Sequence, residues 1–371
     1  MKIAIVLNTS WNIYNFRMGL INSILENGHD ITAIAPRDEY TPHLVEAGCS
    51  YEEVTMDSRG ANAIKDFGLI IELLGIYRRI KPDVILHYTI KPNIYGTLAA
   101  SILRIPAVNN VCGLGTAFLN KGLVSKIAIG MYKLAFKFPK LIYFQNDDDK
   151  RFFEENNIIK NNATQVLPGS GINLSHFKPA PEVANKKFTF LLISRLIHDK
   201  GIIEYIDAVR YLKEKGIDAN FQILGNKDTE HRRGISEDII NSWIESNVVE
   251  YLGSTDDVRP FINKADCVVL PSYREGTPKS LLEAASSAKP IVATNVAGCT
   301  NIVQDNVNGL LCNVKDVKDL ADKLEAMTNM PKSRLEKMGK ESRKIVEERF
   351  DEQIVIKSYL NTISSLGAVK K

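Results

Sequence analysis

The clearest indication of the fold is the stretch Phe188-Thr-Phe-Leu-Leu-Ile-Ser-Arg-Leu-Ile-His-Asp-Lys-Gly201. Its first six residues, 188–193, form an unbroken apolar run, which predicts a strand buried on both faces. A helical pattern follows from Gly201 to Lys215 and is closed by Gly216. A buried strand that leads directly into a helix is the repeating unit of a parallel α/β sheet.

The same alternation of short apolar runs and amphipathic segments fills the rest of the chain. Further strands are predicted at 2–7, 31–35, 83–87, 106–111, 141–145, 221–224, 248–252, 267–270 and 291–294, and further helices at 15–27, 67–80 and 351–366. A chain of 371 residues is too long for one ordinary core. We therefore expect two Rossmann-like domains, each with a parallel sheet.

The segment 178–187, which begins Lys178-Pro-Ala-Pro-Glu182, breaks all periodicity and predicts a linker. It divides a domain of residues 1–177 from a domain of residues 188–350, and the last segment, 351–371, is expected to pack back on the first domain. Open parallel sheets bind ligands at the carboxyl ends of their strands. The predicted ligand site is therefore a central cleft between two domains that face each other.

Composition excludes several classes of protein. The net charge of +3 lacks the strongly basic character of nucleic-acid-binding proteins. The five cysteines show no CxxC spacing, which predicts reduced thiols in a cytoplasmic protein and neither a disulfide framework nor a metal site. No uncharged apolar run approaches about 18 residues, so no membrane span is expected, and the apolar run at 3–7 is too short for a signal peptide.

Two fixed cations follow the strand at 188–193. Arg195 stands at the carboxyl edge of the predicted sheet, and Lys200 with Gly201 is expected to open the next helix. Arginine offers bidentate donors, lysine a compact charge, and a helix N-terminus further free N–H groups. This combination suits a diphosphate, although a helix-start lysine and a surface Arg195 paired with Asp199 would explain the same residues.

Two carboxylates, Glu275 and Glu283, flank the next loop and helix in Glu275-Gly-Thr-Pro-Lys-Ser-Leu-Leu-Glu283. Thr277 is the expected N-cap and Pro278 the expected first helical residue. Glu275 and the backbone from Gly276 to Lys279 would then meet a sugar and its phosphates, and Glu283 a ribose diol. Alone, such a pair is more often one solvated glutamate and one helix-surface glutamate. Together with the cations, it predicts a site for a sugar nucleotide.

In this order the motifs resemble those of the family 4 retaining glycosyltransferases, which have the GT-B fold. The resemblance extends to Leu224-Gly225-Asn226-Lys-Asp228, Tyr251-Leu252-Gly253, Leu270-Pro-Ser272 and Asn308-Gly309-Leu310. It implies that Arg195, Lys200 and Glu275 are catalytic. By the same resemblance the donor would also contact Glu283, Gly276, Thr277, Pro278 and Lys279, and its base would lie near Gly225, Asn226 and Leu252.

The first half contains the stretches Asn8-Thr-Ser-Trp-Asn-Ile-Tyr-Asn-Phe-Arg17 and His87-Tyr-Thr-Ile-Lys-Pro-Asn-Ile-Tyr-Gly96. With them it resembles members that build bacterial surface polysaccharides, some of which act on undecaprenyl-diphosphate sugars. The expected acceptor-side residues are Ser10, Asn12, Asn110, Gly113 and Gly115. Two family features are missing: Thr9-Ser10-Trp11 replaces a common Gly-Gly pair, and Asn110 and its neighbours stand where many members have a histidine. The acceptor side therefore departs from the family pattern.

The resemblance implies a metal-independent transfer with retention, from a nucleotide-diphosphate sugar with UDP as the commonest nucleotide. The acceptor would be a saccharide or an undecaprenyl-diphosphate-linked saccharide. Two alternatives remain open: a sugar-nucleotide 2-epimerase, and a non-catalytic sugar-nucleotide-binding subunit of another transferase. No cofactor is expected in any of these cases.

Two charged segments need a separate interpretation. Asp147-Asp-Asp149 matches a metal-binding DxD, but three acids in the first turn of a helix explain it more simply. The segment 121–140 holds five lysines and no acid. As one helix it would place Lys126, Lys133, Lys137 and Lys140 on one face, either as a solvated surface or as an attachment to anionic lipid at the inner face of the plasma membrane.

Overall fold

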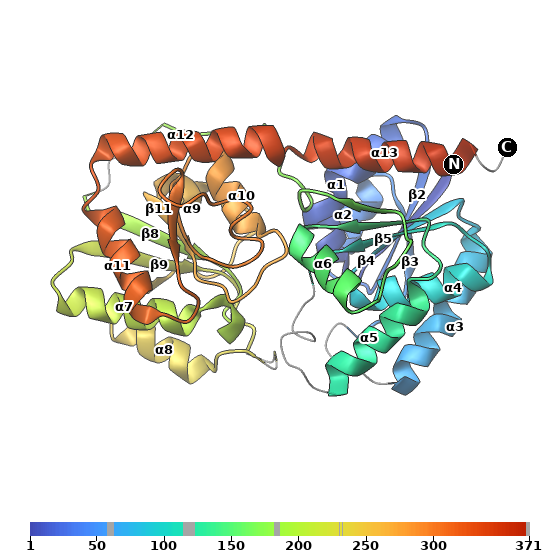
Figure 1. The fold of residues 1–371 in the computed structure, drawn as a ribbon, viewed down its shortest axis with the longest axis horizontal. Helices are drawn as coiled ribbons and strands as arrows, with labels where there is room; N and C mark the ends of the chain where they lie inside the picture. Colours follow the sequence, from blue (N-terminus) through green and yellow to red (C-terminus); the bar gives the residue numbers. More distant parts are fainter. Residues whose placement is uncertain (58–62, 114–122, 182–185, 230, 232, 369–371) are drawn as a thin grey trace. The chain divides into compact units, whose positions relative to one another are not determined.

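The structure is a computed structural model that describes residues 1–57, 63–113, 123–181, 186–229, 231 and 233–368. The chain forms two compact units (Figure 1). The first unit contains Met1–Ser170 together with Glu352–Lys371, and the second contains Gly171–Asp351.

The first unit is built on a parallel sheet with the strand order β3-β2-β1-β4-β5-β6-β7. Its strands are β1 (Lys2–Val6), β2 (Asp30–Ala35), β3 (Ser50–Glu53), β4 (Val84–Tyr88), β5 (Ala107–Val111), β6 (Leu141–Phe144) and β7 (Thr164–Val166). Its helices are α1 (Ser10–Glu26), α2 (Thr41–Glu46), α3 (Ala63–Ile80), the π-helix η1 (Pro92–Gly96), α4 (Thr97–Ile102), α5 (Leu123–Ala135), α6 (Asp147–Glu155) and α13 (Glu352–Ala368).

Helices cover both faces of this sheet. Alternate residues of each buried strand point to opposite faces and so pack against different helices. Ile3 and Ile5 pack with α1 and α13, whereas Ala4 and Val6 pack with α3 and α4. The final helix α13 belongs to this unit through Tyr359, which is buried against Tyr88 and Tyr143.

The second unit has a parallel sheet with the order β10-β9-β8-β11-β12-β13. Its strands are β8 (Phe188–Ile193), β9 (Ala219–Leu224), β10 (Glu250–Tyr251), β11 (Cys267–Leu270), β12 (Ile291–Thr294) and β13 (Gly309–Cys312). Its helices are the 3-10 turn η3 (His198–Lys200), α7 (Ile202–Glu214), α8 (Glu237–Glu245), α9 (Arg259–Lys264), α10 (Lys279–Ser286), α11 (Val317–Thr328) and α12 (Lys332–Arg349).

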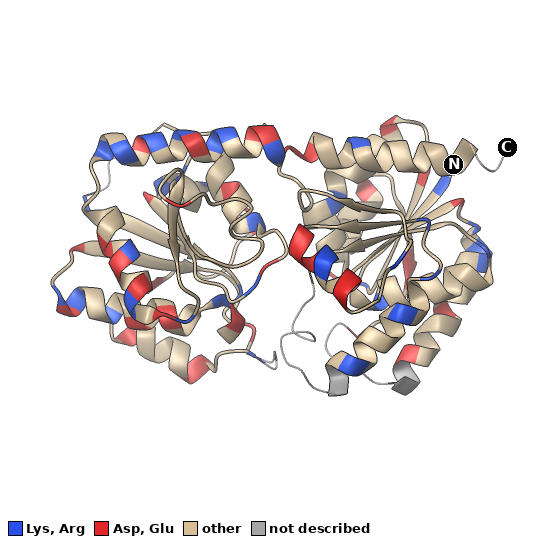
Figure 2. Ribbon diagram, in the orientation of Figure 1, with Lys and Arg blue, Asp and Glu red and all other residues tan. Residues whose placement is uncertain are grey.

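The apolar run 188–193, which forms β8, is buried on both faces, as its composition predicted. Phe190 and Leu192 pack with α7, α8 and α11, and Leu191 packs on the opposite face with α9, α10 and α12. Most residues of the strands in both sheets are uncharged (Figure 2). The prediction of two parallel α/β sheets is confirmed.

All ten predicted strands are present, but β3, β7 and β13 were not predicted. Each is the edge strand of its sheet. β3 and β7 contain no fully buried residue, so neither shows the apolar run that identifies a central strand.

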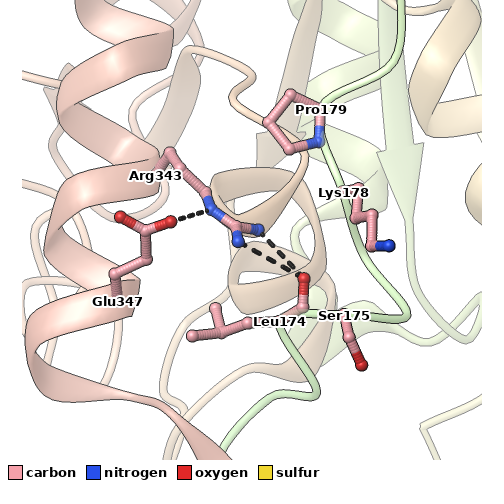
Figure 3. A pocket seen from close by; sticks show the side chains of 6 residues that line it. All are labelled: Leu174, Ser175, Lys178, Pro179, Arg343 and Glu347. Carbon is pink, nitrogen blue, oxygen red and sulfur yellow. Dashed lines mark hydrogen bonds and ion pairs between the residues drawn. The ribbon is translucent and has the colours of Figure 1, made fainter.

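The boundary between the units lies at 170/171 and not at the predicted 177/178. Ile172 forms a β-bridge with Asp351, which ties the start of the second unit to its end. The guanidinium of Arg343 on α12 donates to the carbonyl oxygen of Leu174 at 3.3 Å (Figure 3). It also donates to the carbonyl oxygen of Phe177 at 2.7 Å. These bonds lie beside a surface hollow lined by Leu174, Lys178 and Glu347. They fasten residues 174–177, which were predicted to end the first domain, to the second unit.

Candidate functional site

The candidate site lies where the strand order of the second sheet reverses. β8 leads to β9 on one side and β11 leads to β12 on the other, while β8 and β11 are direct neighbours. The loops that follow β8 and β11 therefore diverge from adjacent strand ends. Such switch points are where open parallel sheets bind ligands.

Lys200 and Glu275 meet at this switch point. Lys200 Nζ donates to Glu275 Oε1, and the two side chains are only 21% and 11% exposed. Lys200 ends the turn η3 and does not open α7, whose N-cap is Gly201 at φ +68°. A Cβ on Gly201 would lie 2.1 Å from the carbonyl oxygen of Pro271, so only glycine lets the two loops approach so closely.

Arg195 shortly precedes Lys200 in the sequence, and its side chain is more exposed to solvent than those of Lys200 and Glu275. Its side chain is 56% exposed, and its Nη1 lies 3.2 Å from Asp228 Oδ2. The alternative partner considered for it, Asp199, is paired with Arg233 at 2.7 Å. The sequence analysis did not identify Asp228 as a partner of Arg195 and did not single out Arg233, because both lie in a polar loop after β9 that has no regular pattern.

The loop after β9 packs tightly against the end of β8. Gly225 has φ +153°, and a Cβ there would lie 1.8 Å from the carbonyl oxygen of Ser194. The Gly225 N–H donates to Gly253 O at 2.8 Å, and Asn226 O accepts from Leu196 N at 3.0 Å. The Asn226 side chain is exposed and Leu252 is half-buried. Glycine at 225 is thus required by the close approach of two loops.

The helix that carries Glu283 begins one residue later than expected. Pro278 is its N-cap, without a side-chain capping bond, and Lys279 is its first residue. Glu283 is only 7% exposed, and burial raises its pKa from 4.5 to about 7, against the lowering effect of Lys279. Lys279 Nζ lies 3.8 Å from Glu283 Oε1. Glu283 is therefore a buried carboxyl group and not a surface residue.

Gly298, which the sequence analysis did not single out, holds the Glu275 loop in place. Its φ is +84°, and a Cβ would lie 2.5 Å from Gly276 O and 2.6 Å from Glu275 O. A glycine shortly after the predicted strand at 291–294 was the available signal. Tyr273, also not predicted, donates from its hydroxyl to Glu204 Oε1 at 2.6 Å and so ties the same loop to α7.

The acceptor-side candidates of the first unit are mostly engaged within the protein. Ser10 is fully buried, and its hydroxyl donates to Pro36 O at 3.1 Å. Asn110 is 1% exposed and donates from Nδ2 to Tyr359 Oη at 2.8 Å. Asn12 is half-buried, and its Nδ2 donates to Asn8 Oδ1 at 3.4 Å. The buried Ser10 and Asn110 side chains therefore bind other residues of their own unit in this structure.

The other two acceptor-side candidates are the glycines Gly113 and Gly115, of which the structure describes only Gly113. Gly113 has φ +111°, a conformation that favours glycine. Gly115 lies outside the described residues. Whether these positions contact an acceptor stays a prediction.

A buried cation near these residues was missed. Arg17 on α1 is 4% exposed, lies 4.3 Å over the ring of Tyr88, and approaches Cys112 Sγ at 3.6 Å through Nη2. Among the residues the structure describes, no carboxylate pairs with it, and its Nε has no hydrogen-bond partner. Nothing in the sequence distinguished this arginine from a surface residue of an amphipathic helix.

Asp147-Asp-Asp149 forms the first turn of α6, as the simpler interpretation predicted. Asn146 is the N-cap and accepts from the N–H of Asp149 at 2.7 Å. Within the described ranges, no group of three or more His, Cys, Asp or Glu side chains is placed to hold a metal ion.

The lysine-rich segment is only partly helical. α5 ends at Ala135, so Lys137 and Lys140 lie beyond the helix and do not continue its face, contrary to the prediction. Lys126, Lys133, Lys137 and Lys140 are nevertheless all exposed. Figure 2 shows basic and no acidic residues along α5. None of the described helices is long and apolar enough to cross a membrane.

Two family descriptions together cover most of the chain. Residues 2–146 match "Glycosyl transferase 4-like", and residues 175–345 match "Glycosyl transferases group 1". An N,N'-diacetylbacillosaminyl-diphospho-undecaprenol alpha-1,3-N-acetylgalactosaminyltransferase of Campylobacter jejuni is 30% identical over 380 positions, which cover 97% of each chain. A UDP-Gal:alpha-D-GlcNAc-diphosphoundecaprenol alpha-1,3-galactosyltransferase of Escherichia coli is 24% identical over 73% of each chain.

Solved structures of the same architecture are more distant in sequence. Sucrose-phosphate synthase of Thermosynechococcus elongatus has a TM-score of 0.84 at 16% identity, with both chains fully covered. Anabaena HepE in complex with UDP-glucose has a TM-score of 0.80 at 19% identity, covering 98% of this chain and 100% of that one. The chain therefore belongs to the family 4-like, group 1 glycosyltransferases and has the GT-B fold.

Proposed function

We propose that this glycosyltransferase transfers a sugar from a UDP-sugar to an undecaprenyl-diphosphate-linked saccharide in bacterial surface polysaccharide synthesis, with retention and without a metal ion. The observation that carries the proposal is the pairing of Lys200 with Glu275 at the switch point of the second sheet. The names of the Campylobacter and Escherichia relatives support a lipid-diphosphate acceptor, and the Escherichia name supports a UDP donor.

In this proposal the donor diphosphate binds Arg195 and Lys200. Arg195 is exposed enough to meet a ligand, and Lys200 is already oriented by Glu275. Fixed cations at the place where the leaving diphosphate gains charge stabilise the transition state, because they need no reorganisation during the reaction. Glu275 contacts the transferred sugar, Glu283 accepts from the ribose hydroxyls, and the base lies near Gly225, Asn226 and Leu252.

The proposed reaction is a front-face displacement. The bond between the anomeric carbon and the phosphate oxygen breaks, the acceptor hydroxyl oxygen bonds to that carbon from the same side, and the departing phosphate takes the hydroxyl proton. The product then keeps the configuration of the donor. An inverted anomer, detected by NMR of the product, would contradict this step.

The donor site is tested by calorimetric titration of UDP-, GDP- and ADP-sugars in EDTA. One nucleotide sugar should bind in the micromolar range, and Arg195→Ala and Glu275→Ala should each abolish that binding. Arg210→Ala is the control, because Arg210 forms only an exposed pair with Asp207 on α7. Failure of every nucleotide sugar to bind the folded protein would contradict the proposal, as would binding without turnover.

The protein is proposed to act at the cytoplasmic face of the membrane that holds the lipid-linked acceptor. The exposed lysines 126, 133, 137 and 140 would contact anionic headgroups there. Exposed apolar side chains accompany them: Ile127 is 56%, Leu134 46% and Phe138 47% exposed. Basic and apolar side chains on one surface are typical of proteins that bind membranes peripherally.

A further inference from the structure

A cavity of about 600 Å³ opens in the first unit, and none of the candidate residues considered above lines it. Pro36 and Arg37 line it directly after β2, Val54 to Asp57 after β3, and Lys91 after β4. Residues of α3 close its side. The cavity thus lies at the carboxyl edge of the first sheet, where parallel sheets bind ligands, and its size suits a small molecule.

One part of the cavity wall is apolar and belongs to the core. Val54, Met56 and Leu69 line it and are 1%, 7% and 3% exposed, so their positions are fixed by packing. Such a wall suits the C–H face of a sugar ring or a methyl substituent.

The rest of the wall consists of hydrogen-bonding groups held in place by their own contacts. Lys91 Nζ lies 2.7 Å from Asp66 Oδ1, and the Tyr95 hydroxyl donates to Asp66 Oδ2 at 2.9 Å. Glu72 Oε1 accepts from the backbone N–H of Thr55 at 2.9 Å. Carboxylate oxygens accept more than one hydrogen bond, so acceptor capacity remains for hydroxyl groups.

The charges of the cavity decide which ligand it suits. Four carboxylates line it, namely Glu53, Asp57, Asp66 and Glu72, against two cations, Arg37 and Lys91. This excess of negative charge would repel a phosphate or a uronic acid. Carboxylates beside an apolar wall instead suit a neutral sugar, whose hydroxyls donate and whose N-acetyl methyl is apolar.

We propose that this cavity binds the neutral, N-acetylated sugar of the acceptor, and that the acceptor's diphosphate lies outside it. This inference rests on the proposed function for its assignment to the acceptor. Val54 and Met56 contact the acetyl methyl, while Glu72 and Asp57 accept from ring hydroxyls.

Two glycines of α3 give a matched test. A Cβ at Gly68 or at Gly75 would meet no atom within 4 Å, but only Gly68 lines the cavity. Leucine at either position should favour the helix by about 1 kcal/mol, so neither variant should lose stability. Saturation-transfer NMR with N-acetylglucosamine, N-acetylgalactosamine and glucuronate then measures which of these sugars binds the protein and which of its protons contact it.

The acetyl methyl of at least one N-acetyl sugar should give a signal with the wild type and with Gly75→Leu. The signal should fall at least tenfold with Gly68→Leu and with Glu72→Gln, and glucuronate should give none. Equal signals from both glycine variants, no signal from any N-acetyl sugar, or equal binding of glucuronate would overturn the inference. Donor titrations separate the two proposals, since Gly68→Leu should bind the UDP-sugar normally even if the cavity assignment fails.

Discussion

Lys200 and Glu275 form a hydrogen-bonded ion pair although 75 residues separate them in the chain. Each follows one of the two adjacent strands, β8 and β11, at which the order of the second sheet reverses. The pairing is thus a direct consequence of the topology. It also orients Lys200 before any ligand arrives, and this preorganisation is what a transition-state-stabilising cation requires.

Lys200→Met should lower the transfer rate by about 10²–10³-fold, because it removes a fixed donor and leaves Glu275, only 11% exposed, without its cation. Steady-state kinetics and donor titration measure the two effects separately. Lys187→Met is the matched control, since its pair with Asp218 is exposed on both sides and exposed pairs contribute little. Similar small effects for both variants would show that the buried pair has no special role.

Gly298→Ala should displace the Glu275 loop and weaken donor binding. The added Cβ would lie 2.5 Å from Gly276 O, and φ +84° is unfavourable for alanine by about 1–2 kcal/mol. We expect a lower Tm and at least tenfold weaker donor binding in calorimetry. Gly216→Ala has a similar φ of +79° but no atom within 4 Å, so it should lower Tm and leave donor affinity unchanged.

The sequence predicted the central strands of both sheets, the loops that carry Lys200 and Glu275, and the helix that carries Glu283. It succeeded there because buried parallel strands are continuous apolar runs, and because charged residues directly after such runs must lie at the sheet edge. It did not predict Asp228 as a partner of Arg195 and did not single out Arg233, because partners in irregular loops depend on tertiary contacts that no local pattern encodes.

The acceptor side shows the limit of the sequence most clearly. Ser10 and Asn110 stand near strand ends where the family pattern has a Gly-Gly pair and a histidine, yet both are buried and bonded to other residues of the first unit. The cavity near Glu72 was not predicted, since its wall comes from four separate segments that no single motif links. Burial and side-chain direction, and not strand position, decide which residues are available to a ligand.

Glu283 should make stability depend on pH. Its pKa is about 7 in the folded protein and 4.5 in its ordinary state, so between these values the folded state holds a proton that the unfolded state has released. The free energy of unfolding should therefore fall as pH rises from 4.5 to 7, by roughly 3 kcal/mol in all, and then level off. Chemical unfolding at a series of pH values measures this slope.

Glu283→Gln should reduce that slope and stabilise the second unit at pH 8, because the amide does not ionise on burial. Glu336→Gln, an exposed residue of α12, is the control and should leave the slope unchanged. An unaltered slope in Glu283→Gln would mean that another group is responsible.

Arg17→Met should leave Tm unchanged or raise it. Arg17 is buried without a carboxylate partner among the described residues, and replacing such a charge by an apolar side chain of similar length removes a desolvation cost. Arg343→Met is the contrasting variant, because its guanidinium donates to Leu174 O and Phe177 O, which would lose these bonds. Thermal unfolding should show a clear fall only for Arg343→Met. A comparable fall for Arg17→Met would show that its contact with Tyr88 outweighs desolvation.

The triple variant Lys126→Glu, Lys133→Glu, Lys137→Glu should strongly weaken binding to vesicles that contain phosphatidylglycerol. Each basic residue near an anionic surface contributes about 1 kcal/mol, so the partition coefficient should fall at least 100-fold in a sedimentation assay. Exposed Ile127, Leu134 and Phe138 should leave weak residual binding that is insensitive to salt. The control reverses three exposed lysines of α12, Lys337, Lys340 and Lys344, in the second unit. If both triple variants lose binding equally, the attraction follows net charge and α5 is not the attachment surface.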